Sequence, residues 1–269
     1  MSELELLWAA LLAYVAAGSI AIVGVVMQRR VERAVLALAV AGLAVHALSL
    51  ALRWDRLGHG PFITLFEVLS SNVFSLLLVY SIAYARVRAI RPTAAVVMPI
   101  LFLMMGWLLV AKADDSHLPQ TYHTVWLWVH VGLGKVFLGS VLVAVGISGV
   151  VLLRAAGIGT SRFAALPADE KLERLAFRFM VLGFVFETLM LVAGAIWAQN
   201  AWGRYWAWDP LETWAFMTWL ALAFVLHLRA TTKLAPAIGS AAIVAVFVLA
   251  FLTFFGVPFV STAPHKGAI

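Results

Sequence analysis

Eight long apolar stretches are the feature that most constrains this chain. They cover roughly residues 4–26, 34–52, 66–85, 93–111, 125–153, 175–198, 213–229 and 236–256. A helix needs about 20 apolar residues to cross the hydrocarbon layer of a bilayer. Because backbone polar groups in lipid must be satisfied within the segment, each stretch is predicted to be a transmembrane α-helix.

The composition supports a membrane protein without a separate soluble domain. Only 12% of the residues are charged and 64% are hydrophobic, whereas about 25% of a soluble domain is charged. The connections are too short for a second domain, so residues 1–269 are expected to form a single polytopic, all-α membrane domain. The first stretch follows Glu3 and Glu5 instead of basic residues, so it is expected to remain in the mature protein.

The basic residues are distributed unevenly between the two predicted sides of the membrane. One side, with its adjoining helix ends, holds thirteen: Arg29, Arg30, Arg33, Arg86, Arg88, Arg91, Arg154, Arg162, Lys171, Arg174, Arg178, Arg229 and Lys233. The other side holds five: Arg53, Arg56, Lys112, Arg204 and Lys266. By the positive-inside rule, both termini and the connection between the sixth and seventh helices are expected to lie outside.

The chain contains no cysteine. It therefore has no disulfide and no thiolate ligand for a metal or cluster. Any thiol chemistry connected with this protein must come from a partner or a substrate.

The connection between the sixth and seventh predicted helices, residues 197–212, is rich in tryptophan. An aromatic belt at the membrane interface explains one or two rings at a helix end. Large flat rings also form a platform for a large flat ligand, and Arg204 and Tyr205 are placed to bind its carboxylates. Trp202 and Trp206 share a face if the loop is helical. The eighteen residues 197–214 contain five of the eleven tryptophans: Trp197, Trp202, Trp206, Trp208 and Trp214.

Asp209-Pro210-Leu211-Glu212 has the pattern of a helix start. Aspartate caps helices, proline is favoured at the first helical position, and glutamate at the third completes a capping box. Asp209 and Glu212 are thus candidates both for helix capping and for contacts with a ligand.

Residues 202–214, together with Leu226-His227-Leu228-Arg229, resemble the WWD signature of haem-handling cytochrome c assembly proteins. Within that superfamily the chain is most similar to the CcsA (ResC) subunit of system II cytochrome c synthetases. The segment from Arg53 to Glu67 also resembles that subunit, so the resemblance extends from about Arg53 to the tail.

The resemblance implies that the protein binds haem b on the outer face of a bacterial cytoplasmic membrane. His130 and His265 are the implied axial ligands there, and bis-histidine ligation leaves no open position for oxygen. His227 lies eighteen residues beyond Asp209, about 27 Å along a helix at 1.5 Å per residue, so it implies a second, inner haem site. The implied haem contacts are Trp202, Arg204, Tyr205, Trp206, Trp208, Asp209 and Glu212.

The resemblance also implies partners and an activity. A CcsB (ResB)-type membrane subunit completes the inner site with its own histidine, haem moves outward, and apocytochrome c presents its C-x-x-C-H thiols for thioether formation. Thiol-reducing partner proteins keep those cysteines reduced. Two alternatives remain open: a haem transporter or chaperone without ligation activity, and a non-haem regulatory membrane protein of the same superfamily. Leu211 stands where the family usually has lysine, and this difference is compatible with either alternative.

The remaining ionisable residues within predicted helices are candidates for buried roles. A charge inside the membrane costs about 2.5–3.5 kcal/mol, so Lys135 and Glu187 are expected to face the bundle interior and to pair. His46 lies mid-helix, either along a haem path or as a buried histidine bonded to a backbone carbonyl. Three others are expected to be solvated loop residues: His59, His117 and His123.

Overall fold

The computed structural model describes residues 2–257, and it contains eight helices long and apolar enough to span a membrane. No strand occurs within these residues, so the prediction of an all-α membrane protein is confirmed. The helices are α1 (Glu3–Val26), α2 (Glu32–Leu57), α3 (Leu65–Arg86), α4 (Ala94–Val110), α5 (Val125–Ala155), α6 (Asp169–Trp202), α7 (Pro210–Thr231) and α8 (Pro236–Phe251). Short 3₁₀ helices cover Arg88–Thr93 and Gln120–Tyr122, and a π-helix covers Leu252–Gly256.

Three of the helices, α1, α3 and α7, begin at residues whose side chains cap them. Thr64 starts α3 with a capping box, because its hydroxyl accepts the N–H of Glu67 and the Glu67 carboxylate accepts the N–H of Thr64. Pro210 and Pro236 occupy the first position of α7 and α8, where the missing N–H leaves no hydrogen bond unmade.

Helix α6 extends beyond its predicted bounds of 175–198 at both ends. Most of its additional residues are polar or charged, and they continue the helix where the hydrocarbon layer no longer requires an apolar sequence. The tryptophan-rich loop is therefore shorter than predicted, because Trp197 and Trp202 belong to α6.

The structure divides into two compact units. Unit 1 comprises Met1–His117 and Gly149–Leu172, and unit 2 comprises Leu118–Ser148 and Glu173–Ile269. Helices α5 and α6 each pass from one unit to the other. A single functional membrane domain over residues 1–269 remains a prediction.

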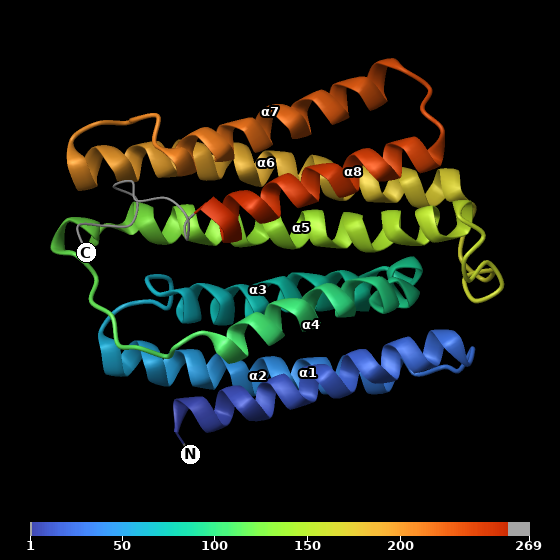
Figure 1. Cartoon of the computed structure of the whole chain (residues 1–269), viewed down its shortest axis with the longest axis horizontal. Coiled ribbons are helices and arrows are strands. Elements are labelled where there is room, and N and C mark those ends of the chain that lie inside the picture. The colour runs from blue at the N-terminus through green and yellow to red at the C-terminus, as the bar shows by residue number, and fades with distance from the viewer. Residues whose placement is uncertain (1, 258–269) are drawn as a thin grey trace. The chain divides into compact units, whose positions relative to one another are not determined.

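In unit 1, α1 packs against α2 and α4, and α3 packs against α2 and α4 (Figure 1). The α1–α2 contact is close because Gly42 has no side chain, and a Cβ there would lie 2.6 Å from the Tyr14 ring. His46 is fully buried beside this contact. Its Nδ1 lies 3.2 Å from the Tyr14 hydroxyl and its Nε2 lies 3.0 Å from that of Ser70. Both of these partners are side-chain hydroxyls, whereas the sequence analysis considered a backbone carbonyl.

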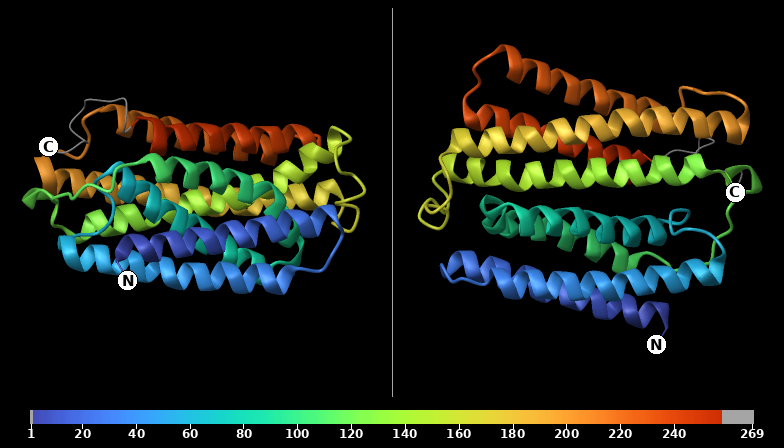
Figure 2. Two further views of the ribbon diagram at one scale, coloured as in Figure 1. Left: turned by 60° about the horizontal axis from the view of Figure 1, so that its bottom comes forward. Right: turned by 180° about the vertical axis from the view of Figure 1, so that it is seen from behind.

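In unit 2, α5 and α6 lie side by side (Figure 2). The two helices approach closely at glycines: a Cβ on Gly183 would lie 3.1 Å from the Val141 side chain, and one on Gly134 would lie 3.0 Å from Sδ of Met190. Helix α7 packs against α8 and against the π-helix that follows it, where the Thr218 and Thr253 hydroxyls hydrogen-bond at 2.9 Å. Unit 2 contains the tryptophan-rich loop, His130 and His227.

Candidate functional site

The loop between α6 and α7 runs from Gly203 to Asp209 and is strained at one residue. Gly203 ends α6 with φ of 77°, a left-handed conformation that glycine adopts freely. Trp208 also has a positive φ, 57°, although its side chain is bulky. Strained residues of this kind cluster at functional sites. The strained Trp208 therefore marks the loop as a candidate site on grounds independent of its composition.

Asp209 and Glu212 fix the junction of the loop with α7. The Asp209 carboxylate accepts the N–H of Glu212 at 2.9 Å, as expected of a helix cap. The Glu212 carboxylate accepts the N–H of Ala207 at 2.7 Å. The predicted capping box is therefore only half present, because Glu212 reaches back into the loop and not to Asp209. Through these two hydrogen bonds, Glu212 holds both Ala207 and Asp209, the residues on either side of Trp208.

The loop and its flanking helices carry two aromatic clusters. In the first, the Trp197 ring lies edge-on to Trp202 and Tyr122, with centroids 4.9 and 5.0 Å away. In the second, Trp206 lies edge-on to Trp208 and Phe216, at 5.7 and 6.2 Å. The condition under which Trp202 and Trp206 would share a face is not met, because α6 ends at Trp202 and residues 203–209 are not helical.

His130 lies in the first turns of α5 and belongs to the first aromatic cluster. Its ring stacks on Trp197, with centroids 6.0 Å apart and planes inclined by 15°. Its Nδ1 lies 2.9 Å from the carbonyl oxygen of Met190 on α6. Because a carbonyl oxygen only accepts, Nδ1 donates to Met190, and in the neutral form of the ring Nε2 then carries the lone pair. This arrangement is the usual one for a histidine that binds a metal through Nε2.

Gly194 makes the position of His130 possible. A Cβ at residue 194 would lie 2.7 Å from Nδ1 of His130, so the imidazole would have to move. Gly194→Ala is therefore expected to lower the melting temperature of the purified protein, since overpacking typically costs about 1–3 kcal/mol. Gly132→Ala is the matched control, because open space surrounds a Cβ there. Equal melting temperatures for the two variants would contradict this account of Gly194.

The remaining loop residues divide into exposed and partly buried groups. Arg204, Tyr205 and Trp208 are exposed. Nε1 of Trp206 is buried and has no hydrogen-bond acceptor within the described part of the chain. An indole N–H is a donor only, so this atom can donate a hydrogen bond to an oxygen of a ligand. His265 lies outside the described residues.

His227 lies toward the opposite end of α7 from the loop, and its side chain is exposed. Helix α7 continues without interruption between Asp209 and His227, so the axial separation of about 27 Å derived from helix geometry applies. Two residues further, Arg229 forms an ion pair with the buried Glu173 of α6, with Nη2 2.9 Å from Oε2. The sequence analysis did not identify Glu173, because its partner lies 56 positions away.

The expected pairing of Lys135 with Glu187 is wrong. Glu187 is fully buried, and neither of its carboxylate oxygens has a hydrogen-bond partner within residues 2–257. The face of α5 that packs on α6 carries His130, Gly134 and Phe137, as the close approaches of α6 glycines and Met190 to these residues show. Lys135 follows Gly134 by one residue, about 100° around the helix, and so lies off that face.

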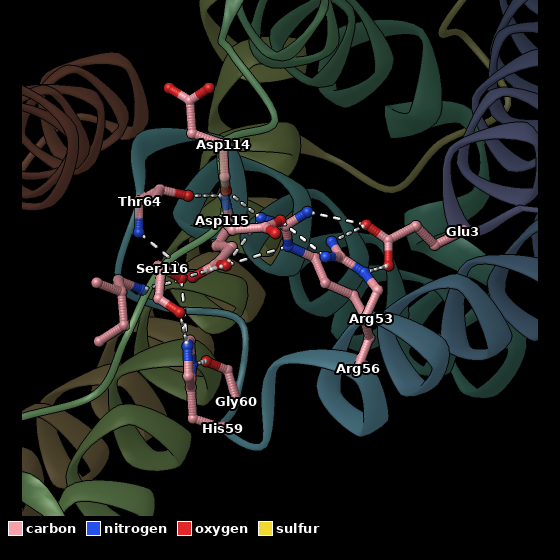
Figure 3. A network of polar contacts seen from close by, with 11 residues as sticks. Glu3, Arg53, Arg56, His59, Gly60, Thr64, Asp114, Asp115 and Ser116 are labelled. Carbon is pink, nitrogen blue, oxygen red and sulfur yellow. Dashed lines mark hydrogen bonds and ion pairs between the residues drawn. The ribbon is translucent and has the colours of Figure 1, made fainter.

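The three loop histidines differ from one another. His117 and His123 are exposed, as expected. His59 is not solvated, because only 4% of its surface is exposed and both ring nitrogens contact carbonyl oxygens. Its contacts belong to a polar cluster in unit 1 (Figure 3).

Comparison with known proteins identifies the family. Residues 61–265 match the sequence model of the cytochrome c assembly proteins, and they include all of α3, the tryptophan-rich loop and α7. The chain belongs to the cytochrome c assembly protein family. It is thus a multi-pass membrane protein of cytochrome c biogenesis, and its family handles haem.

Relatives and a solved structure agree with this assignment. The cytochrome c biogenesis protein CcsA of Prochlorococcus marinus (strain MIT 9312) is 32% identical over 214 residues, which cover 68% of this chain and 67% of the relative. CcsA of Gossypium hirsutum is 27% identical over 257 residues, covering 81% and 80%. The solved cytochrome c haem lyase CcmF has the same fold, with a TM-score of 0.71 at 19% identity. The match covers 95% of this chain and about half, 47%, of CcmF.

Proposed function

We propose that this protein holds haem b at the tryptophan-rich loop for attachment to apocytochrome c, with His130 as an axial ligand of the iron. The observation that carries the proposal is the setting of His130. Its Nδ1–H bonds the Met190 carbonyl and its ring stacks on Trp197, so in the neutral ring Nε2 is the nitrogen with the lone pair. A histidine fixed in one tautomer and one orientation is prepared to bind iron.

The surrounding residues fit a haem by chemistry as well as by composition. Gly194 provides space for the imidazole that a side chain would fill, and Nε1 of Trp206 is a buried donor with no acceptor in the described chain. The exposed Arg204 and Tyr205 are donors suited to propionate groups. Trp202, Trp206 and Trp208 supply apolar ring surface. Asp209 and Glu212 act by fixing the loop on α7.

The chain's own residues bind and orient, and the cofactor supplies the reactive bonds. When bound, haem b supplies the vinyl groups that form thioethers with the cysteines of a C-x-x-C-H segment. His265 is the second axial ligand in this proposal. Because this chain has no cysteine, the thiols belong to apocytochrome c, and separate thiol-reducing proteins keep them reduced.

A second haem site lies at His227 in this proposal, on the inner side of a bacterial cytoplasmic membrane, with the tryptophan-rich loop on the outer side. The exposed imidazole of His227 is available to a haem shared with another subunit. A CcsB (ResB)-type membrane subunit supplies the other ligand, and haem passes from the inner site to the outer one. The uneven distribution of arginine and lysine supports this orientation.

An absorption spectrum of the purified protein tests the proposal, taken with and without a co-expressed CcsB-type subunit. A Soret band in stoichiometric proportion to protein is expected in the complex. A colourless protein under both conditions would overturn the haem assignment and favour a non-haem regulatory role within the same superfamily.

A further inference from the structure

Three stacked rings connect α6 to α7 beyond the tryptophan-rich loop, and the proposed function assigns them no role. Phe184 belongs to α6, whereas Phe216 and Trp219 belong to α7. The Trp219 ring lies between the other two, with centroids 5.4 Å from Phe184 and 5.9 Å from Phe216 and planes inclined by 26° and 10°. These three rings form the aromatic column.

A hydrogen bond fixes Trp219 against α6. Its indole Nε1–H donates to the Thr188 hydroxyl at 2.8 Å, and that hydroxyl donates to the carbonyl oxygen of Phe184 at 2.8 Å. An indole N–H can only donate, and the hydrocarbon layer contains no water to accept from it. Thr188 therefore supplies the acceptor that a tryptophan within a membrane-spanning helix requires.

The position of Trp219 is not that of an interfacial tryptophan. It lies nine residues beyond Pro210, the first residue of α7, which corresponds to about 14 Å along the helix axis. The tryptophans of an aromatic belt lie at the level of the lipid headgroups. Trp214, near the start of α7 and 39% exposed, fits that description, whereas Trp219 is half-buried and bonded to α6. The aromatic belt therefore does not account for Trp219.

The aromatic column ends at the two tryptophans of the loop. The Phe216 ring lies edge-on to Trp206 and Trp208, with centroids 6.2 and 6.4 Å away. Trp206 and Trp208 are also edge-on to each other, at 5.7 Å. The three ring planes are inclined to one another by 82°, 80° and 79°, so they form a three-sided corner. Phe216 is the side of this corner that belongs to a helix.

The loop tryptophans require support from outside the loop. Trp208 is 68% exposed and has a φ of 57°. A strained conformation persists only where the surrounding structure determines it. The hydrogen bonds of Glu212 hold the backbone on either side of Trp208, but they do not set the angle of its ring. The edge-on contact with Phe216 supplies that part of the geometry.

We propose that Trp219 is a positioning residue for the candidate haem site. Trp219, fixed by Thr188, holds the ring of Phe216 at a set angle. Phe216 in turn holds Trp206 and Trp208, so that the Nε1–H of Trp206 and the exposed Trp208 ring keep the arrangement that a ligand contacts. The ligand's being haem rests on the proposed function, whereas the ordering of the two loop rings does not.

Fluorine-19 NMR of the full-length, haem-free protein in lipid nanodiscs, labelled with 5-fluorotryptophan, tests the proposal. Trp206→Phe and Trp208→Phe assign the two loop signals, and each is expected to be one sharp resonance in the wild type. Trp219→Leu removes both stacked contacts of the column. Two aromatic contacts of ordinary strength change the ratio of ordered to mobile rings about tenfold, so both loop resonances are expected to broaden or to move toward the position of a mobile indole.

Two further substitutions control for the loss of a large side chain. Trp214→Leu removes a tryptophan of the same helix that makes no contact with another ring among the described residues, and it should leave the loop resonances unchanged. Trp219→Phe keeps a ring in the aromatic column, and Thr188 remains bonded to the Phe184 carbonyl. This conservative variant should retain both sharp resonances.

A rescue experiment keeps the test independent of the volume lost in Trp219→Leu. Thr188→Val leaves the indole N–H of Trp219 without its acceptor inside the membrane, where an unpaired polar group is costly, so the loop resonances should broaden. Adding Trp219→Phe to Thr188→Val removes the unpaired donor and should restore them. The signals of Trp197 and Trp202, in the first aromatic cluster, report whether each variant remains folded.

Sharp loop resonances at wild-type positions in Trp219→Leu would overturn the proposal, and so would an equal loss in Trp214→Leu. Where Trp219→Leu also disturbs the signals of Trp197 and Trp202, the rescue decides, and failure of Trp219→Phe to rescue Thr188→Val overturns the proposal.

Haem binding provides a separate measurement. Trp219→Leu is expected to weaken haem binding by the purified protein about tenfold, while Trp214→Leu leaves it unchanged. Equal weakening by both substitutions would contradict the positioning role. A wild-type protein that binds no haem would contradict the proposed function, and the fluorine spectra would still decide whether Trp219 orders the loop.

Discussion

His130→Ala is expected to remove most of the Soret absorption of the outer site. The substitution deletes the imidazole whose Nδ1–H bonds the Met190 carbonyl and whose Nε2 is directed to iron in the proposed function. Loss of even the hydrogen-bond partner of a metal ligand weakens metal binding about 10–100-fold, and loss of the ligand itself should exceed that. The measurement is the Soret absorbance per mole of purified complex.

Two additions separate loss of ligation from loss of fold. Free imidazole can occupy the space that alanine leaves, so it is expected to restore a low-spin spectrum. His123→Ala, which removes an exposed histidine seven positions earlier, should retain wild-type absorbance. An unchanged spectrum in His130→Ala would contradict the assignment of this residue as a ligand, and a similar loss in His123→Ala would indicate a general defect.

Arg53→Met is expected to destabilise unit 1 strongly. The substitution leaves Glu67 buried without the guanidinium that bonds it, and removes the bond to the Asp114 carbonyl. Breaking a buried ion pair by removing one partner typically costs about 3–5 kcal/mol, because a charge remains uncompensated. The midpoint of unfolding in a denaturant series, followed by a probe in unit 1, measures this loss.

Arg56→Met is the matched control for that experiment. Arg56 also bonds Glu3, but its side chain is 45% exposed. Solvent-screened ion pairs of this kind contribute about 0–1 kcal/mol. Equal destabilisation by the two substitutions would show that burial of the Arg53–Glu67 pair has no special importance.

The number and approximate positions of the helices could be predicted from the sequence because lipid permits few alternatives. Each apolar stretch had to satisfy its own backbone, so each became a helix. The ends were less predictable. Hydropathy does not report where a helix stops outside the hydrocarbon layer, and α6 accordingly continues to Trp202 through residues assigned to the loop.

The candidate site was predictable in its residue types but not in its packing. The tryptophan content and Asp209 identified the loop, and the helix cap at Asp209 is present. Local patterns could not show that Glu212 bonds Ala207, or that a glycine 64 positions away makes room for His130. The prediction that Lys135 pairs with Glu187 was wrong because an apolar stretch does not show which face of a helix packs on its neighbour.

His59 illustrates the same limit for a loop. Its adjacent residues, Gly58 and Gly60, and the following Pro61 are typical of a loop, which favours a solvated residue. Its burial depends on Ser116, 57 positions later in the chain. Contacts over such separations are set by tertiary packing, and a single sequence contains no periodic pattern that indicates them.

The measurement that tests the central claim most directly is covalent attachment of haem to a C-x-x-C-H segment. The purified protein and its CcsB-type partner are incubated under reducing conditions with haem and an apocytochrome c, and covalent haem is detected by mass after denaturation. The account predicts a haem adduct on the apocytochrome, and none when both cysteines are replaced by serine. Haem bound to the protein without any adduct on the apocytochrome would contradict the synthetase role and leave a haem-delivery protein.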